Sequence, residues 1–355
     1  MVEKIRYGVI GVGGHGKNRH LIPLTRLSDQ VQVSAVSDIN KQRCEEISSQ
    51  FKVKCYYDYM EMIEKEALDA VSIVTPTGTH ANIAIDVLSK GINALVDKPL
   101  GANLEEVIKV VKTAENKGAK LMVGYWTRFS PAIQFAKEVK LGEPYVAYGY
   151  LVRRRGIPGI PTFIDQKLSG GRGVLLDIGC YVIDNVLSIL KFRKPISVMG
   201  KVYTKFGNKS EETKFNWGTW DPKRFNLDDY AIAYIKLEKD ISFVLEVGWA
   251  GNVSHVEERG YIRILGDEGG LEGIGNEAIV DISYHSRTEN FLVDTKPHLG
   301  KVDLPFEMVK SFVKSIMENR VPPITGYESV VLHSIIDAIY KSSEENREVR
   351  VTLPD

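Results

Sequence analysis

Residues 7–16 read Tyr-Gly-Val-Ile-Gly-Val-Gly-Gly-His-Gly, and this stretch decides the fold of the first third of the chain. It places a G-x-G-x-x-G pattern directly after a strand-like run and before a helical segment. In that context Gly11 makes a tight turn, Gly13 lets the backbone approach a pyrophosphate, and Gly16 lets the helix lie close to the sheet. The N–H groups at the start of such a helix favour bound phosphates. The residues that we expect over the phosphates are Gly13, Gly14 and His15.

A carboxylate at the end of the second expected strand strengthens this interpretation, because glycine-rich turns also occur without any ligand. Asp38 follows the run Val31–Ser37, at a position where a carboxylate accepts hydrogen bonds from both ribose hydroxyls. The same charge repels a 2′-phosphate, so we expect NAD as the preferred cofactor. NADP stays open, because Lys41 and Arg43 lie just downstream and would neutralise a phosphate. We count Arg43 among the expected cofactor-binding residues.

The first third of the chain alternates short apolar runs with helical patterns, which is typical of a parallel sheet with crossover helices. The clearest helix is Leu104–Lys117, where apolar residues repeat at helical spacing and Gly118 ends the helix. The expected strands lie near Ile5–Gly11, Val31–Ser37, Ala70–Val74, Ala94–Val96 and Leu121–Gly124. We therefore expect an α/β fold with a doubly wound parallel sheet in a dinucleotide-binding domain of residues 1–124.

Beyond residue 124 the strands follow one another with turns between them. A hairpin is expected over Tyr230–Trp249 with its turn at Lys239 and Asp240, because alternate residues of its second arm are apolar. This pattern predicts a second, α+β domain over residues 125–355 with a largely antiparallel open sheet. The segment 208–228 has no usable period and stays unassigned. Further strands are expected at Tyr145–Val152, Ser197–Lys205 and Tyr261–Leu265, and helices near Phe306–Glu318 and Glu328–Ser343.

The bulk composition narrows the partners and the compartment. Lys plus Arg and Asp plus Glu both number 46, so there is no electrostatic signature of nucleic-acid or membrane binding. The three cysteines, Cys44, Cys55 and Cys180, match no zinc or redox motif, and we expect free thiols and no metal. The N-terminus shows no signal-peptide pattern and no apolar stretch reaches the roughly 20 residues of a membrane span. We expect a soluble, cytoplasmic protein with a small-molecule substrate.

Two motifs lie at the carboxyl ends of expected parallel strands, where doubly wound domains bind their ligands. Residues 75–80 read Thr-Pro-Thr-Gly-Thr-His, and residues 97–99 read Asp-Lys-Pro. Most lysines are solvated surface groups, but Lys98 follows a buried strand whose end points toward the ligand. The residues that we expect near the cofactor from these motifs are Thr75, Pro76, Thr77, His80, Asp97 and Lys98.

A third motif lies in the second domain, where residues 170–184 begin Gly-Gly-Arg-Gly and continue as an apolar helix. Asp177, Tyr181 and Asp184 are spaced i, i+4 and i+7, so an α-helix would place them on one face. A polar trio in so apolar a helix needs polar partners. A substrate would supply them, and so would a hydrogen-bond network inside the core.

In this order and spacing the motifs resemble those of the glucose-fructose oxidoreductase, inositol dehydrogenase and rhizopine-catabolism (Gfo/Idh/MocA) family. The resemblance covers essentially the whole chain. It implies an N-terminal Rossmann domain, a C-terminal domain for substrate binding and oligomerisation, and a homodimer or homotetramer formed through the open sheet. It also implies oxidation or reduction of sugars, inositols and related compounds with NAD(H) or NADP(H).

The resemblance also assigns roles to residues. Lys98 matches the active-site lysine of the family's E-K-P motif, with Asp97 in place of the usual glutamate. Asp177 matches the aspartate that contacts substrate near the reacting carbon. Tyr181 falls where many members carry a histidine that exchanges a proton, and some carry a tyrosine. We expect Lys98, Asp177 and Tyr181 to be the catalytic residues and to contact the substrate.

Proton transfer by this trio requires that neighbouring groups shift the pKa of the group that exchanges the proton. A free tyrosine and a free lysine have pKa values of about 10 and about 10.4, so neither is a suitable base alone. A cation about 4 Å from a phenol stabilises the phenolate by on the order of 4 kcal/mol at an effective dielectric constant of about 20, and so lowers the pKa of the phenol. We therefore expect Lys98 to polarise Tyr181 and the reacting oxygen.

Three further residues are candidate substrate ligands. Tyr125 and Arg128 follow the last strand of the first domain, and Arg128 would bind substrate oxygens or form a structural ion pair. Arg154 lies in the run Arg153–Arg155, which is either an exposed basic loop or a recognition element for an acidic or phosphorylated sugar.

Two other functions are compatible with the same residues. A glycosidase that oxidises and reduces its substrate with a tightly held NAD would need the same groups. A sensor that binds a sugar or a dinucleotide without turnover would need the fold but not the catalytic trio.

Overall fold

The computed structural model describes residues 4–354 apart from residues 215, 255–257 and 276. It divides into two units, one of Met1–Trp126 with Asp303–Ser329 and the other of Thr127–Val302 with Val330–Asp355. The sequence analysis assigned every residue after 124 to the second domain. The structure instead returns Asp303–Ser329 to the first unit, because this segment pairs with it: Val123 N–H donates to Ile324 O at 3.3 Å, and the Tyr7 and Phe312 rings meet edge to face.

The described part of the first unit contains a parallel sheet of six strands, in the order β3-β2-β1-β4-β5-β6. The strand order reverses between β1 and β4, which is the topological switch point of a Rossmann fold. This confirms the predicted doubly wound sheet. The short edge strand β3 was not predicted. The strands are β1 (Ile5–Ile10), β2 (Val31–Ser37), β3 (Lys54–Tyr56), β4 (Ala70–Ile73), β5 (Asn93–Asp97) and β6 (Leu121–Gly124).

Local sequence signals set the helices of the first unit. In α6 (Leu104–Lys117) the Asn103 side chain accepts from Glu106 N–H at the start, and Gly118 ends the helix at φ 62°. The predicted apolar stripe of this helix is buried, as expected. The other helical segments are α1 (Gly14–Gly16), η1 (Lys17–Leu21), α2 (Ile22–Thr25), α3 (Lys41–Phe51), α4 (Tyr59–Lys65), α5 (Thr77–Ser89) and α11 (Leu304–Met317), with η2 (Trp126–Phe129) at the boundary.

The described part of the second unit contains a mixed sheet of nine strands, in the order β16-β15-β14-β13-β7-β12-β11-β9-β17. Only the pair β7 and β12 is parallel among these described strands. The predicted hairpin is confirmed, and Lys239 and Asp240 adopt the positive φ values, 60° and 59°, of a tight turn. The strands are β7 (Pro144–Val152), β9 (Pro195–Tyr203), β11 (Tyr230–Leu237), β12 (Ile241–Gly248), β13 (Gly260–Gly266), β14 (Gly269–Gly275), β15 (Ile279–Arg287), β16 (Leu292–Thr295) and β17 (Val349–Arg350).

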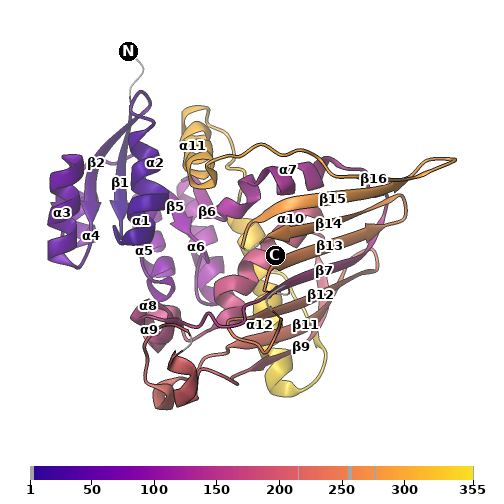
Figure 1. The fold of residues 1–355 in the computed structure, drawn as a ribbon. Coiled ribbons are helices and arrows are strands. Elements are labelled where there is room, and N and C mark those ends of the chain that lie inside the picture. Colours follow the sequence, from indigo (N-terminus) through magenta and orange to yellow (C-terminus); the bar gives the residue numbers. More distant parts are fainter. Residues whose placement is uncertain (1–3, 215, 255–257, 276, 355) are drawn as a thin grey trace. The chain divides into compact units, whose positions relative to one another are not determined.

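Helices cover one face of this sheet (Figure 1). Gly149 of β7 lies against Val182 of α10, and Gly200 of β9 lies against Ile339 of α12. Buried residues alternate with accessible ones along β11 and β12, so the opposite face stays open. The helical segments are α7 (Pro131–Glu138), α8 (Pro161–Ile164), α9 (Gln166–Ser169), η3 (Leu175–Gly179), α10 (Cys180–Ile189), η4 (Ser210–Lys214), η5 (Pro222–Arg224) and α12 (Gly326–Glu345), with β8 (Pro158–Gly159) and β10 (Trp217–Gly218) forming a small separate sheet.

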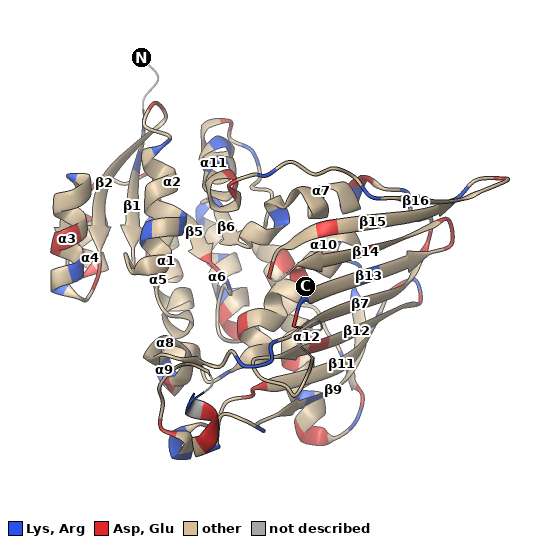
Figure 2. Cartoon of the chain, viewed as in Figure 1, with Lys and Arg blue, Asp and Glu red and all other residues tan. Residues whose placement is uncertain are grey.

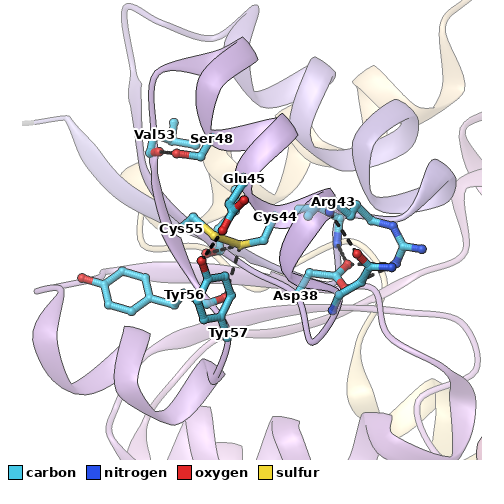
Figure 3. The surroundings of a disulfide bond; sticks show 12 residues. Asp38, Arg43, Cys44, Glu45, Ser48, Val53, Cys55, Tyr56 and Tyr57 are labelled. Atoms are coloured by element: carbon cyan, nitrogen blue, oxygen red, sulfur yellow. Dashed lines mark hydrogen bonds and ion pairs between the residues drawn. A yellow bond between two sulfur atoms is a disulfide. The ribbon is translucent and has the colours of Figure 1, made fainter.

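The expectation that all three cysteines are free thiols is not met. Cys44 of α3 and Cys55 of β3 form a disulfide, with their Cα atoms 5.7 Å apart, whereas Cys180 is free and buried (Figure 3). The prediction of three free thiols was therefore wrong. The spacing of the two cysteines does not predict this pairing. The pairing depends on the packing of α3 against the edge strand β3, and the sequence did not predict that strand.

Charges of both signs are interspersed over both units (Figure 2). None of the helices in the described parts of the chain has the length and apolar character that a membrane crossing requires.

Candidate functional site

The glycine-rich turn has the geometry that its sequence predicts. Gly11 has φ +86°, and a Cβ there would lie 2.5 Å from Val74 O, so only glycine fits. A Cβ on Gly16 would lie 2.0 Å from Gly11 O, which confirms that the helix packs tightly on the turn. Around Gly14, in contrast, a Cβ would meet nothing within 4 Å, and at Gly13 it would meet only Arg43 Nη1 at 3.9 Å. This open backbone at a helix start suits the pyrophosphate of a dinucleotide.

Asp38 lies at the end of β2, as predicted, and is 7% exposed. Its Oδ2 accepts from Val12 N–H at 3.0 Å, and its Oδ1 accepts from Asn40 N–H at 2.9 Å. Arg43 Nη1 lies 3.2 Å from Oδ2 and 3.3 Å from Oδ1 (Figure 3). Asp38 therefore fixes the glycine-rich turn in addition to the ribose contact predicted for it, and Arg43 is held beside it.

Asp97, which precedes Lys98 at the end of β5, is 6% exposed and surrounded by histidines. Its Oδ1 accepts from Lys98 N–H at 2.8 Å, and its Oδ2 lies 2.8 Å from His15 Nε2 and 3.9 Å from His20 Nε2. Burial acts to raise the pKa of Asp97, but His15, His20 and His80 outweigh it and hold the pKa well below its usual range. The carboxylate is thus charged and ties the glycine-rich segment to the backbone of Lys98.

His80 joins the two predicted motifs of the first unit. Its Nδ1 lies 2.7 Å from Pro99 O and its Nε2 lies 2.7 Å from Thr75 O. Burial lowers the pKa of His80, against the raising effect of both carbonyl groups and of Asp97. The turn is completed by Thr79 Oγ1, which donates to Pro76 O at 2.7 Å. The segment Thr75–His80 therefore also holds the turn that carries Lys98, through the contact of His80 with Pro99 O.

In the second unit the helix that carries the candidate residues is not a regular α-helix. Asp177 lies in the π-helical turn η3 (Leu175–Gly179), and Tyr181 follows at the start of α10. A π turn is wider than an α-helical turn, so the regular α-helix expected over this segment is interrupted at Asp177. That Asp177, Tyr181 and Asp184 share one face stays a prediction. Asp177 is half-buried, whereas Tyr181 is 2% and Asp184 is 0% exposed. Such irregular turns occur frequently at functional sites.

Arg128 and Asp184 form a buried ion pair. The guanidinium donates through Nε and Nη2 to the two carboxylate oxygens, at 2.7 and 2.6 Å. It also lies 4.7 Å from the centre of the Phe192 ring. Of the two roles left open for Arg128, the structure shows the structural ion pair.

The sequence analysis missed two groups that hold the segment around Asp177. Trp249, fully buried after β12, donates from Nε1 to Asp177 Oδ2 at 2.9 Å. Asp228 accepts from Gly173 N–H at 2.8 Å and Leu175 N–H at 2.9 Å, and burial raises its pKa against these hydrogen bonds. Asp228 lies at the end of the unassigned segment, so no periodicity pointed to it.

The three arginines of 153–155 have different surroundings. Arg153 Nη2 lies 2.8 Å from Glu277 Oε1, and Arg155 Nε lies 2.7 Å from Glu212 Oε2. The side chain of Arg154 is exposed. Two of the three charges are thus neutralised within the second unit. Tyr125, the other predicted substrate ligand, is 1% exposed in the first unit.

Comparison with known proteins agrees with this geometry. Residues 5–125 match the model of the oxidoreductase family with an NAD-binding Rossmann fold, and residues 132–272 match the GFO/IDH/MocA C-terminal domain. D-glucoside 3-dehydrogenase of Escherichia coli is 23% identical over 98% of this chain and 97% of its own. Rhizopine catabolism protein MocA of Rhizobium meliloti is 29% identical over 52% of this chain and 57% of its own.

A solved structure shows the same fold over the whole chain. Levoglucosan dehydrogenase, in complex with NADH and levoglucosan, superimposes with a TM-score of 0.84 at 19% identity, covering 98% of this chain and 100% of that one. With a parallel sheet in the Rossmann strand order and both domain models matched, the chain belongs to the Gfo/Idh/MocA family of oxidoreductases with an NAD-binding Rossmann fold.

Proposed function

We propose that the protein transfers a hydride between NAD(P) and a hydroxyl or carbonyl carbon of a sugar, inositol or sugar derivative. The observation that carries this proposal is the placement of Lys98, whose backbone is held by buried, charged Asp97 at the carboxyl end of β5. That edge of a doubly wound sheet is where its ligands bind. The relatives support the substrate class, since they include dehydrogenases of a glucoside, of D-xylose and of UDP-N-acetylglucosamine.

The cofactor site in this proposal is the edge of the first unit. Gly13, Gly14 and His15 face the phosphates, and Asp38 accepts from the ribose. Arg43 is the group that would tolerate a 2′-phosphate, but its pairing with Asp38 favours NAD. The residues expected near the cofactor from the second motif, Thr75, Pro76, Thr77 and His80, line the same edge with Asp97.

The chemistry is divided among Lys98, Asp177 and Tyr181. When bound, the nicotinamide accepts or supplies the hydride. Tyr181 takes the proton from the reacting hydroxyl or returns it to the forming alkoxide, and Lys98 stabilises the negative charge on that oxygen. Asp177 accepts a hydrogen bond from a substrate hydroxyl and so orients the reacting carbon.

In this proposal Arg128 takes no part in substrate selection, although the sequence offered it as a candidate substrate ligand. We assign Arg128 to the stability of the second unit because its guanidinium is committed to Asp184. Arg154 remains the candidate for an acidic group on the substrate, and Tyr125 the candidate for a ring contact.

The open face of the larger sheet supports a homodimer or homotetramer. Accessible apolar side chains continue across neighbouring strands of this face, which is unusual for a surface in water. Of the acids on this face, Glu246 is engaged by the Tyr148 and Tyr230 hydroxyls and Glu272 by the Tyr261 hydroxyl. The side chains concerned are Met199, Tyr203, Ile232, Tyr234 and Ile274. A second copy is the occupant that the family resemblance implies, and sedimentation equilibrium tests it.

A cofactor-fluorescence screen tests the proposed function. Aldoses, inositols and uronic acids are each mixed with the protein and with NAD or NADP, and in the reverse direction the corresponding ketones and lactones with NADH or NADPH. We expect turnover with at least one sugar and a preference for NAD. Tight NAD binding without turnover of any compound would contradict the proposal, and so would cleavage of a nitrophenyl glycoside with no net change in cofactor.

A further inference from the structure

We propose that Trp249 is a positioning residue for Asp177, and that its indole N–H fixes the orientation in which this carboxylate meets the substrate. The inference rests on the proposed function, in which Asp177 binds a substrate hydroxyl. It adds a residue that follows β12, far from Asp177 in the sequence, and that controls how strongly, and for which groups, Asp177 binds.

The indole lies where its N–H needs a partner. Trp249 directly follows β12, is 0% exposed, and its backbone N–H donates to Asp229 O at 2.9 Å. An indole Nε1–H is a donor only, and a buried donor without an acceptor is costly. The 2.9 Å hydrogen bond to Asp177 Oδ2 satisfies it. Rotating the Asp177 side chain away would leave that donor unpaired, so the indole restricts the orientation of the carboxylate.

The backbone of the same turn is held from the other side. Asp228, 6% exposed, accepts from Gly173 N–H and Leu175 N–H, and the Tyr340 hydroxyl donates to Asp228 Oδ1 at 2.8 Å. Asp177 N–H in turn donates to Gly173 O at 3.0 Å. The main chain of the π turn is therefore fixed by Asp228, and its one carboxylate is fixed by Trp249.

This arrangement has a consequence for substrate recognition. A carboxylate accepts hydrogen bonds and carries no donor, and the indole N–H fixes the direction in which the oxygens of Asp177 accept them. A substrate hydroxyl can then donate to Asp177. An asparagine could accept from the indole through its single oxygen but would turn its NH₂ group toward the substrate. Discrimination for a hydroxyl donor therefore requires both the carboxylate and the indole.

A double-mutant cycle on Trp249→Phe and Asp177→Asn tests the inference, with the most active sugar of the screen as substrate. Trp220→Phe is the matched control, because it also loses an indole hydrogen bond, from Nε1 to Gly207 O at 2.7 Å, in the same unit. We expect Trp249→Phe to raise KM for the sugar about 10-fold with NAD affinity unchanged, and to have less than about a 3-fold effect in the Asp177→Asn background. Trp220→Phe should be close to wild type.

If Trp249→Phe folds poorly, a second measurement tests the same inference without any Trp249 variant. In a ¹⁵N spectrum the four indole N–H signals are assigned, and Asp177→Asn should shift the Trp249 signal more than the Trp220 signal. A failure of the proposed function and a failure of the positioning role give different results. Wild-type kinetics in Asp177→Asn would overturn the role of Asp177 in the proposed function. Impaired kinetics in Asp177→Asn, together with an additive effect of Trp249→Phe or an unshifted Trp249 signal, would overturn the positioning role alone.

Discussion

His15 Nε2 lies 2.8 Å from Asp97 Oδ2, so a residue of the glycine-rich segment is bonded to the residue that precedes Lys98. The other oxygen of the same carboxylate accepts from Lys98 N–H. Asp97 thus links the expected phosphate end of the cofactor site to the lysine expected at its reactive end. This link is built wholly within the first unit.

Replacing Asp97 should disturb both ends at once. Asp97→Asn keeps an acceptor for Lys98 N–H but removes the charge that His15, His20 and His80 face. We expect a loss of about 1–3 kcal/mol in the free energy of unfolding and weaker NAD binding, measured by urea denaturation and by fluorescence titration. Asp97→Glu keeps the charge and serves as the control. Equal stability and equal NAD affinity in Asp97→Asn would show that the link does not matter.

His20 should make the stability of the first unit depend on pH. Burial lowers its pKa to about 4, against the opposing effect of Asp97, and neither ring nitrogen has a hydrogen-bond partner among the described residues. Between pH 6.5 and about 4 the unfolded chain binds a proton at this histidine that the folded chain does not. The free energy of unfolding should therefore fall as the pH falls through this window, by on the order of 3 kcal/mol in total.

The contribution of His20 to the pH dependence of stability is the difference between the wild type and His20→Leu. Urea denaturation of the wild type and of His20→Leu at several pH values between 4.5 and 7.5 should give a steeper acid loss for the wild type. Parallel curves for the two proteins would mean that His20 is not buried in its neutral form.

Asp38 should set the choice between NAD and NADP. Asp38→Asn keeps an oxygen for Val12 N–H, but it no longer repels a 2′-phosphate and it releases the charge of Arg43. We expect the ratio of the two dissociation constants to shift toward NADP by about 10-fold or more. Arg43→Gln is the complementary variant and should weaken NADP binding without a comparable effect on NAD. An unchanged ratio in Asp38→Asn would contradict the assignment of Asp38 to the ribose.

The disulfide should be detectable and should contribute to stability. It closes a loop between residues 44 and 55, and cross-links of this size contribute about 2–3 kcal/mol in the chain-entropy model. Alkylation of the denatured, unreduced protein should label one thiol, that of Cys180. The double variant Cys44→Ser and Cys55→Ser should unfold at lower urea concentration than the unreduced wild type. Three labelled thiols would show that the bond does not form.

Much of the first unit follows from local sequence. The glycine turn, the strands Val31–Ser37 and Leu121–Gly124 and the helix Leu104–Lys117 are found with the predicted bounds, because each combines strong periodicity with its own end signals. Strand β3 and the disulfide were missed for a single reason. Three exposed or half-buried residues at a sheet edge carry no alternation to detect.

Less of the candidate site could be predicted from the sequence. Spacing predicted a regular α-helix that carries Asp177 and Tyr181, whereas the structure has a π turn at Asp177, in a segment to which Asp228 and Trp249 are hydrogen-bonded. For Arg128 the sequence offered a substrate contact or an ion pair, and only the position of Asp184 in the core decides between them. The partners that fix functional side chains lie far apart in the sequence, so periodicity within one segment cannot identify them.

The central claim, that Lys98 and Tyr181 move the proton during hydride transfer, is tested most directly by single-turnover kinetics. NADH absorbance is followed after rapid mixing of NAD-loaded protein with the most active sugar of the screen, for the wild type, Lys98→Met and Tyr181→Phe. We expect the hydride-transfer rate to fall at least about 100-fold in both variants while NAD affinity changes little. Wild-type rates in both variants would contradict the account.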